Sequence, residues 1–320
     1  MKDPFGPNPR YARFDCCILL LFITSGCATL EKAAVRGAGE LFAGDDAVAV
    51  FTSDDDPELV RDSLPFAIKA LEILLAQDPG NSSLRLAVGR LYVQYANAFL
   101  QSEADYIEDE DLDAARQLRR RAAKLYSRGR DHALTVLEQR HPGFRASPTN
   151  DNAGVLESTT ADDVPALFWA GASWAASISV QPDNMERVGA LPVVEGIMRR
   201  ALELDPEYDE GAVHEFFIAF EGGRGEMMGG STERATEHYK EAVRLSGGRR
   251  ASPHVTLAET VAVGAQDVQQ FRDLLDKALA VDVDAAPEVR LLNVLSHRRA
   301  RWLLTRTSDL FLDSGEEEME

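Results

Sequence analysis

The stretch PVVEGIMRRALELDPEYDEGAVHEFFIAF, residues 192–220, indicates the fold that we expect for the whole chain. Its first half places apolar residues on one helical face, at Val194, Met198 and Ala201. Asp205-Pro206 ends that helix, because proline lacks a backbone N–H and disfavours helical geometry in the residue before it. A second helix follows at once, with the spacing typical of a tetratricopeptide-type hairpin. One such hairpin has too little core to be stable alone, so the pattern predicts stacked neighbours.

Further hairpin halves follow the same pattern along the chain. Asp56-Pro57 predicts a helix start, because aspartate caps a helix and proline fits its first turn, and Asp78-Pro79-Gly80 predicts its end. Helical periodicity recurs over residues 231–245, 269–281 and 287–304, and no stretch of any length has the alternation of a strand. The sequence therefore predicts an all-α fold, in which helical hairpins of TPR-like repeats are stacked into one superhelical domain over residues 57–312.

The first residues predict a targeting segment. A basic start is followed by the short apolar run CCILLLFI at residues 16–23, which is too short to span a bilayer as a stable helix. Thr24-Ser25-Gly26-Cys27 resembles a bacterial lipobox, although Thr24 stands where leucine is usual. We therefore expect a lipoprotein signal peptide at residues 1–26, lipidation of Cys27, a linker through residue 56 and an acidic tail at residues 313–320.

The cysteines agree with this interpretation. All three, Cys16, Cys17 and Cys27, precede residue 28, so cleavage before Cys27 leaves only the lipidated one. Ala28 is not the acidic residue that retains some lipoproteins in the inner membrane, which favours the outer membrane. The lipid then provides the membrane attachment, and one acyl chain alone would hold only weakly.

Composition and motifs argue against several classes of function. The chain has 320 residues and a formal net charge of −19, which opposes binding to nucleic acid. Residues 103–113 are densely acidic but lack the EF-hand spacing and glycine, so we predict no metal site and interpret the segment as an acidic helix start before a basic helix, joined by i,i+4 pairs. The sequence has no HExxH, GxSxG or nucleotide-binding glycine motif. We therefore predict neither an enzyme nor a bound cofactor.

One helix is uncharged along its whole length. Residues 164–180, VPALFWAGASWAASISV, predict a helix that is buried on all sides, because an amphipathic surface helix would carry a polar face. It serves either as a core helix or as the wall of an apolar cavity. The candidate cavity-lining residues are Phe168, Trp169 and Trp174 on this helix and Phe216, Phe217 and Phe220 on the hairpin.

These segments together resemble one protein family. FTSDDDPELVRDSLPFAIKALEILL, LFWAGASWAASISV, RALELDPEYDEGAVHEFFIAF and LLNVLSHRRARWLL look like the TRAP transporter T-component (TatT) family, in order over about residues 27–312. The resemblance implies cryptic TPR-like repeats, a lipid tether facing the periplasm and a homotrimer with an apolar cavity in each subunit. It also implies association with the solute-binding P component of a tripartite ATP-independent periplasmic transporter and handling of a hydrophobic ligand.

Two functions follow as alternatives. The first is a transporter subunit that docks the periplasmic solute-binding protein and holds or passes a hydrophobic ligand. The second is a cell-envelope scaffold that uses its repeats only for protein–protein assembly and has no transported ligand. Recovery of a solute-binding protein from envelope extract would distinguish the first from the second.

Overall fold

The computed structural model describes residues 37, 44–146 and 154–312, and within them it contains helices and no strand. The predicted all-α class is thus confirmed. The α-helices are α2 (Asp45–Thr52), α3 (Pro57–Gln77), α4 (Ser82–Ala96), α5 (Ser102–Ile107), α6 (Leu112–Arg140), α7 (Val164–Ser179), α8 (Met185–Val188), α9 (Leu191–Leu204), α10 (Tyr208–Gly222), α11 (Thr232–Leu245), α12 (Ser252–Leu257), α13 (Val268–Leu279), α14 (Arg290–Thr305) and α15 (Thr307–Leu310). Two π-helical stretches, η1 (Asn97–Gln101) and η4 (Ala258–Ala262), continue α4 and α12.

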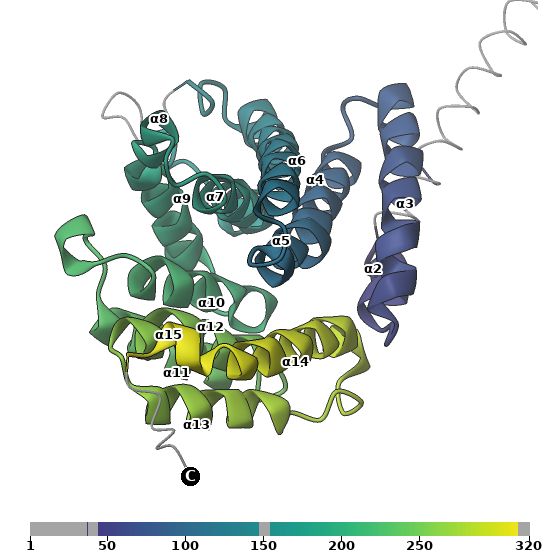
Figure 1. Ribbon diagram of the computed structural model, residues 1–320. Coiled ribbons are helices and arrows are strands. Elements are labelled where there is room, and N and C mark those ends of the chain that lie inside the picture. Colours follow the sequence, from purple (N-terminus) through teal and green to yellow (C-terminus); the bar gives the residue numbers. More distant parts are fainter. Residues whose placement is uncertain (1–36, 38–43, 147–153, 313–320) are drawn as a thin grey trace, which may run out of the picture.

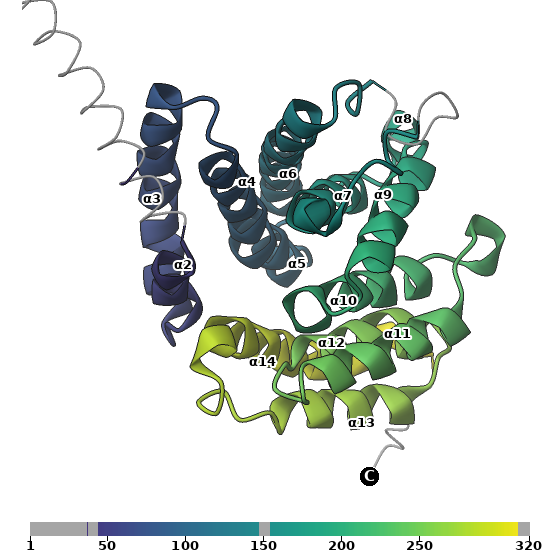
Figure 2. The same cartoon turned by 180° about the vertical axis from the view of Figure 1, so that it is seen from behind.

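The helices follow one another around a closed circuit (Figures 1 and 2). Successive packing runs from α3 through α4, α6, α7, α9 and α10 to the hairpins α11–α12 and α13–α14. Helix α14 then returns to contact α2 and α3, so that the two ends of the helical array meet. Stacking of the hairpins as a TPR-like superhelix remains a prediction.

Three apolar clusters stabilise the circuit. The first joins α3, α4 and the first half of α6, the second joins the end of α6 to α7, α9 and α10, and the third fills the space among α10 to α15. Trp169 packs against both the first and the second cluster. On α10, Phe217 belongs to the second cluster and Ile218 to the third, so α7 and α10 link the parts of the ring.

Two glycines allow α4 and α6 to cross closely. Gly89 on α4 faces Gly129 on α6, and a methyl group placed on Gly129 would lie 2.9 Å from the Gly89 carbonyl oxygen and 2.5 Å from a methyl of Val93. Real side-chain carbons do not approach a neighbouring backbone this closely. Glycine at both positions therefore sets the spacing of α4 and α6.

The hairpin at residues 192–220 contains an unusual turn. Asp209, Glu210 and Gly211 all have positive φ, of 44°, 53° and 95°, and regular helix resumes only after them. Two of these are not glycine, so the backbone is strained. Arg250 bonds Asp209 at 2.6 Å and Arg249 bonds Glu210, and these ion pairs from the α11–α12 connection hold the turn.

The predicted start of α3 is confirmed, because Asp56 caps the helix by accepting the Leu59 N–H at 3.0 Å. Before α7, Asp163 accepts the Thr160 N–H at 2.9 Å in a capping box. The expectation that i,i+4 pairs join the acidic segment to the basic helix is wrong for Arg119. Arg119 reaches back to Glu108 and Asp105, because the chain turns at residues 108–111 and folds α5 against α6.

Some predictions fall on residues that the structure does not describe. These are the signal peptide, Cys27, the linker before residue 44 apart from Gly37, and the tail at residues 313–320. Within the described ranges, none of the helices combines the length and the apolar character that crossing a bilayer requires.

Candidate functional site

The aromatic residues of α7 point to two different surroundings. Phe168 is buried and meets the Trp169 ring edge-on at 5.1 Å, and the Tyr208 ring lies 5.4 Å away. Burial raises the pKa of Tyr208, which is partly buried, to about 12. Trp174 instead lies beneath the guanidinium of Arg130 at 5.1 Å. Trp169 and Trp174 are both partly buried, whereas Phe168 is buried.

The three phenylalanines of α10 differ in exposure. Phe217 has no exposed surface and Phe220 is 7% exposed, whereas Phe216 is partly buried and stacks on Phe220 at 5.3 Å. All six predicted cavity residues belong to, or pack against, the same apolar cluster. The structure therefore brings the six together in one aromatic cluster, in which Phe168 meets Trp169 and the three phenylalanines of α10 meet one another. That they line a cavity stays a prediction.

A pair of histidines borders this cluster. His214 Nδ1 and His238 Nδ1 are 2.9 Å apart, and the His238 ring stacks on Phe217 at 4.9 Å. Burial, with the neighbouring His214, lowers the pKa of His238 to about 4, and burial also lowers the pKa of His214. Both rings are therefore neutral at pH 7, and the N–H of one ring donates a hydrogen bond to the unprotonated nitrogen of the other. No group of three or more metal-ligating side chains occurs in the part of the chain that the structure describes.

A buried carboxylate organises the glycine-rich segment at residues 221–230. Glu221 is fully buried and contacts three guanidiniums, from Arg199 at 3.3 Å, Arg234 at 2.6 Å and Arg224 at 3.8 Å. These arginines come from α9, from α11 and from the segment itself, so Glu221 fixes α10 between its neighbours. Sequence reasoning missed this role, because the only local signal was a single acid next to glycines.

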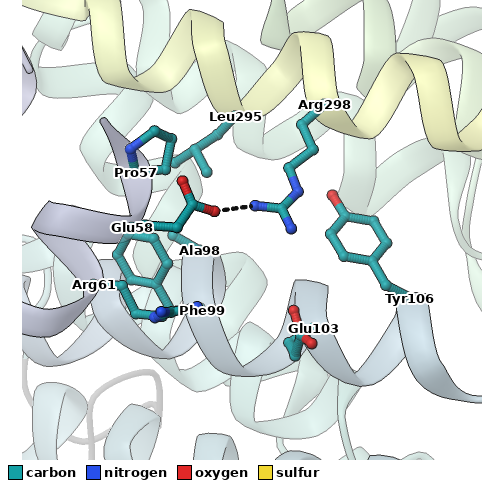
Figure 3. Close-up of a pocket in the computed structure, with 9 residues that line it drawn as sticks. All are labelled: Pro57, Glu58, Arg61, Ala98, Phe99, Glu103, Tyr106, Leu295 and Arg298. Carbon is teal, nitrogen blue, oxygen red and sulfur yellow. Dashed lines mark hydrogen bonds and ion pairs between the residues drawn. The ribbon is translucent and has the colours of Figure 1, made fainter. Parts of the chain in front are cut away.

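The two ends of the ring meet at a polar seam, drawn in Figure 3. Glu58 on α3 accepts a hydrogen bond from Arg298 on α14 at 2.8 Å, and Pro57 and Leu295 lie beside this pair. The cleft here holds only about 20 Å³, which is the space of roughly one water molecule. Tyr106 forms one wall, with its ring 5.5 Å from the Arg298 guanidinium.

A second arginine of α14 links three elements across the seam. Arg299 bonds Asp105 on α5 at 3.2 Å and Glu259 on η4 at 2.6 Å, and it stacks on Trp302 at 4.4 Å. The Glu259 side chain is 28% exposed, and its partial burial raises the pKa of its carboxyl group against the opposing effect of Arg299. Farther along, Arg306 bonds Asp109. The ring is therefore closed largely by arginines that bond acidic side chains of the facing elements.

These observations define a class: an all-α protein of helical hairpins, joined end to end into a ring, with an aromatic cluster on one side and an ionic closure on the other. Comparison with known proteins assigns the family. The chain belongs to the TRAP transporter T-component family, whose model matches residues 53–311. An uncharacterized protein of Treponema pallidum (strain Nichols) is 36% identical over 272 residues, which cover 84% of each chain.

Family membership establishes the general role. It associates the protein with a TRAP transporter, as an accessory component in the cell envelope. The match begins before α3 and ends after α15, so it includes both sides of the seam and the aromatic cluster. The match therefore spans this chain from α3 to α15 and is not confined to one hairpin.

Proposed function

We propose that this protein is the lipid-anchored, periplasm-facing subunit of a tripartite ATP-independent periplasmic transporter, where it docks the solute-binding P component. The family match over residues 53–311 is the observation that carries the proposal. The fold supports it, because hairpin arrays present extended surfaces for protein partners.

Affinity capture tests the docking. The full-length chain, solubilised in detergent from its own envelope, should retain a periplasmic solute-binding protein. Recovery of outer-membrane assembly factors without a solute-binding protein would instead support the envelope scaffold and contradict the transporter role.

The membrane attachment depends on Cys27. We expect the native chain to partition into a detergent phase and Cys27→Ser to stay in the aqueous phase, because one thiol carries the lipid. Density fractionation then tests the expected outer-membrane location. Equal partitioning of the two chains would refute lipidation at this residue.

A hydrophobic ligand is the finer part of the proposal. Trp169, Trp174 and Phe216 are the partly buried members of the aromatic cluster, so they are suitable probes. Phe217 is not, because a polar residue at this fully buried position would disturb the core. Binding of a fluorescent fatty acid should fall with Trp169→Ala, and Trp302→Ala at the seam serves as the control. Equal binding by all three chains would remove the ligand from the proposal.

Self-association into a trimer is the remaining expectation. Light scattering of the detergent-solubilised chain measures it directly, with the detergent mass subtracted. A monomeric mass at all concentrations would contradict it.

A further inference from the structure

A groove of about 350 Å³ lies between α11 and α13, which run side by side in Figure 2. This is the size of a small ligand pocket, and none of its lining residues belongs to the aromatic cluster or to the cleft at the seam. Its walls are Thr236 and Tyr239 on α11, Leu257 on α12, and Asp267, Gln269, Gln270, Asp273, Leu274 and Lys277 at or on α13. Neither the family assignment nor the proposed docking gives this groove a role.

The floor of the groove is apolar and fixed. Leu257 and Leu274 are 2% and 4% exposed, so they present firmly packed surfaces. The Tyr239 hydroxyl is hydrogen-bonded to His254 Nδ1 at 2.9 Å. Burial, with the nearby charge of Lys277, lowers the pKa of His254 to about 4, so the imidazole is neutral at pH 7 and holds the tyrosine in place.

The rim of the groove is polar and carries more negative than positive charge. Asp273 Oδ1 accepts a hydrogen bond from Gln269 Nε2 at 2.8 Å, and Asp267 Oδ1 accepts the Gln270 N–H at 2.9 Å. These bonds orient both carboxylates and use one oxygen of each, while an ionised carboxylate has two oxygens that accept. Lys277 is the one cationic residue on this wall.

We propose that the groove docks an extended polypeptide segment of a protein partner, with a basic side chain held by Asp267 and Asp273 at the rim. The rim amides of Gln269 and Gln270 can both donate to and accept from peptide groups, which suits a main chain. The charge of the rim selects a basic side chain, and the net charge of −19 attracts a basic partner.

This inference rests on the proposed function only in naming the partner: the solute-binding component would present the segment. The two ideas are tested separately. Short peptides report on the groove itself, and capture of the solute-binding protein reports on the docking.

Fluorescence anisotropy with labelled Ala-Leu-Arg-Leu-Ala and Ala-Leu-Glu-Leu-Ala tests the groove on the full-length chain in detergent. The arginine peptide should bind and the glutamate peptide should not. Asp273→Lys should weaken binding about tenfold or more, because it replaces a charge-assisted hydrogen bond by repulsion. Asp276→Lys is the matched control, since Asp276 is exposed on the same helix and is not a wall of the groove.

Three results would overturn the inference. The first is equal binding of the two peptides, and the second is an equal loss of binding in Asp273→Lys and Asp276→Lys. The third is that free arginine displaces the arginine peptide at the same concentration as the unlabelled peptide does. The last result would identify a small-molecule site. Both aspartates are exposed, so circular dichroism should show that both variants fold normally.

Capture of the solute-binding protein completes the test. Asp273→Lys should reduce the captured amount and Asp276→Lys should not. Equal capture by the two variants would show that the groove is not the docking surface. If the unmodified chain captures no solute-binding protein, the proposed function fails, and the peptide result still decides whether the groove binds polypeptide.

Discussion

Replacing Arg299 by methionine should weaken the ring at its seam in a way that depends on pH. The substitution keeps most of the apolar stem that covers Trp302 and removes the charge between Asp105 and Glu259. Breaking a buried ion pair costs about 3–5 kcal/mol, because the remaining charge is left uncompensated. The three side chains keep 22–28% of their surface exposed, so water relieves part of this cost. We therefore expect the free energy of unfolding to fall by about 2 kcal/mol at pH 8.

The pH dependence follows from Glu259. Its folded pKa is already raised, so its contribution to stability is largest at low pH and declines as pH rises through that pKa. Without Arg299 the carboxyl group should take up a proton more easily, and the loss should therefore be smaller at pH 5 than at pH 8. Urea unfolding followed by circular dichroism at both pH values measures the two losses.

Two further chains make the result decisive. Arg301→Met on the exposed side of α14 controls for the loss of a charge from this helix. In the Glu259→Gln background, Arg299→Met should cost clearly less, since no carboxylate is left unpaired at Glu259. Equal losses at pH 5 and pH 8, together with full additivity of the two substitutions, would refute the reasoning.

Three other predictions concern packing and titration. Gly129→Ala should lower stability by about 2 kcal/mol, because its methyl group collides with Gly89, and thermal unfolding should show no comparable loss for Gly80→Ala, where the added carbon meets nothing within 4 Å. Asp163, whose pKa is lowered to about 2 by its hydrogen bonds despite burial, should stabilise the fold by about 2 kcal/mol above pH 4; Asp163→Asn should remove this, and the difference should vanish as pH falls toward 2. The pKa of His238 is lowered to about 4, so the free energy of unfolding should fall by about 2 kcal/mol between pH 6.5 and pH 4, after allowance for the partial exposure of the ring. In urea titrations, His238→Phe should flatten this part of the dependence of stability on pH. An unchanged dependence would contradict the prediction.

The helices and their ends could be predicted because their causes are local. Asp56-Pro57 starts α3, Asp78 follows its last residue, and Asp205-Pro206 ends α9. Each signal acts within a few residues, so one sequence suffices. The left-handed turn at Asp209 and Glu210 was not predicted, because ion pairs from Arg250 and Arg249, about 40 residues away, stabilise it.

The functional features were only partly predictable. The sequence singled out six aromatic residues that do share one cluster, since uncharged and aromatic helix faces pack together. It could not separate the fully buried Phe217 from the partly buried Phe216, which are adjacent in the chain. The seam and the α11–α13 groove depend on contacts between distant segments, which no local sequence pattern indicates.

The closure of the ring has a consequence for the order of folding. Arg298 and Glu58 are 240 positions apart, and Arg290 and the Ser53 carbonyl are 237 apart, whereas neighbouring hairpins associate over short chain distances. Contacts that close so long a loop form late, because the chain must lose conformational entropy before these contacts can stabilise it. The seam should therefore be the last joint to form and the first to separate. Substitutions there should speed unfolding and leave the folding rate almost unchanged, whereas substitutions at the α4–α6 crossing should slow folding itself.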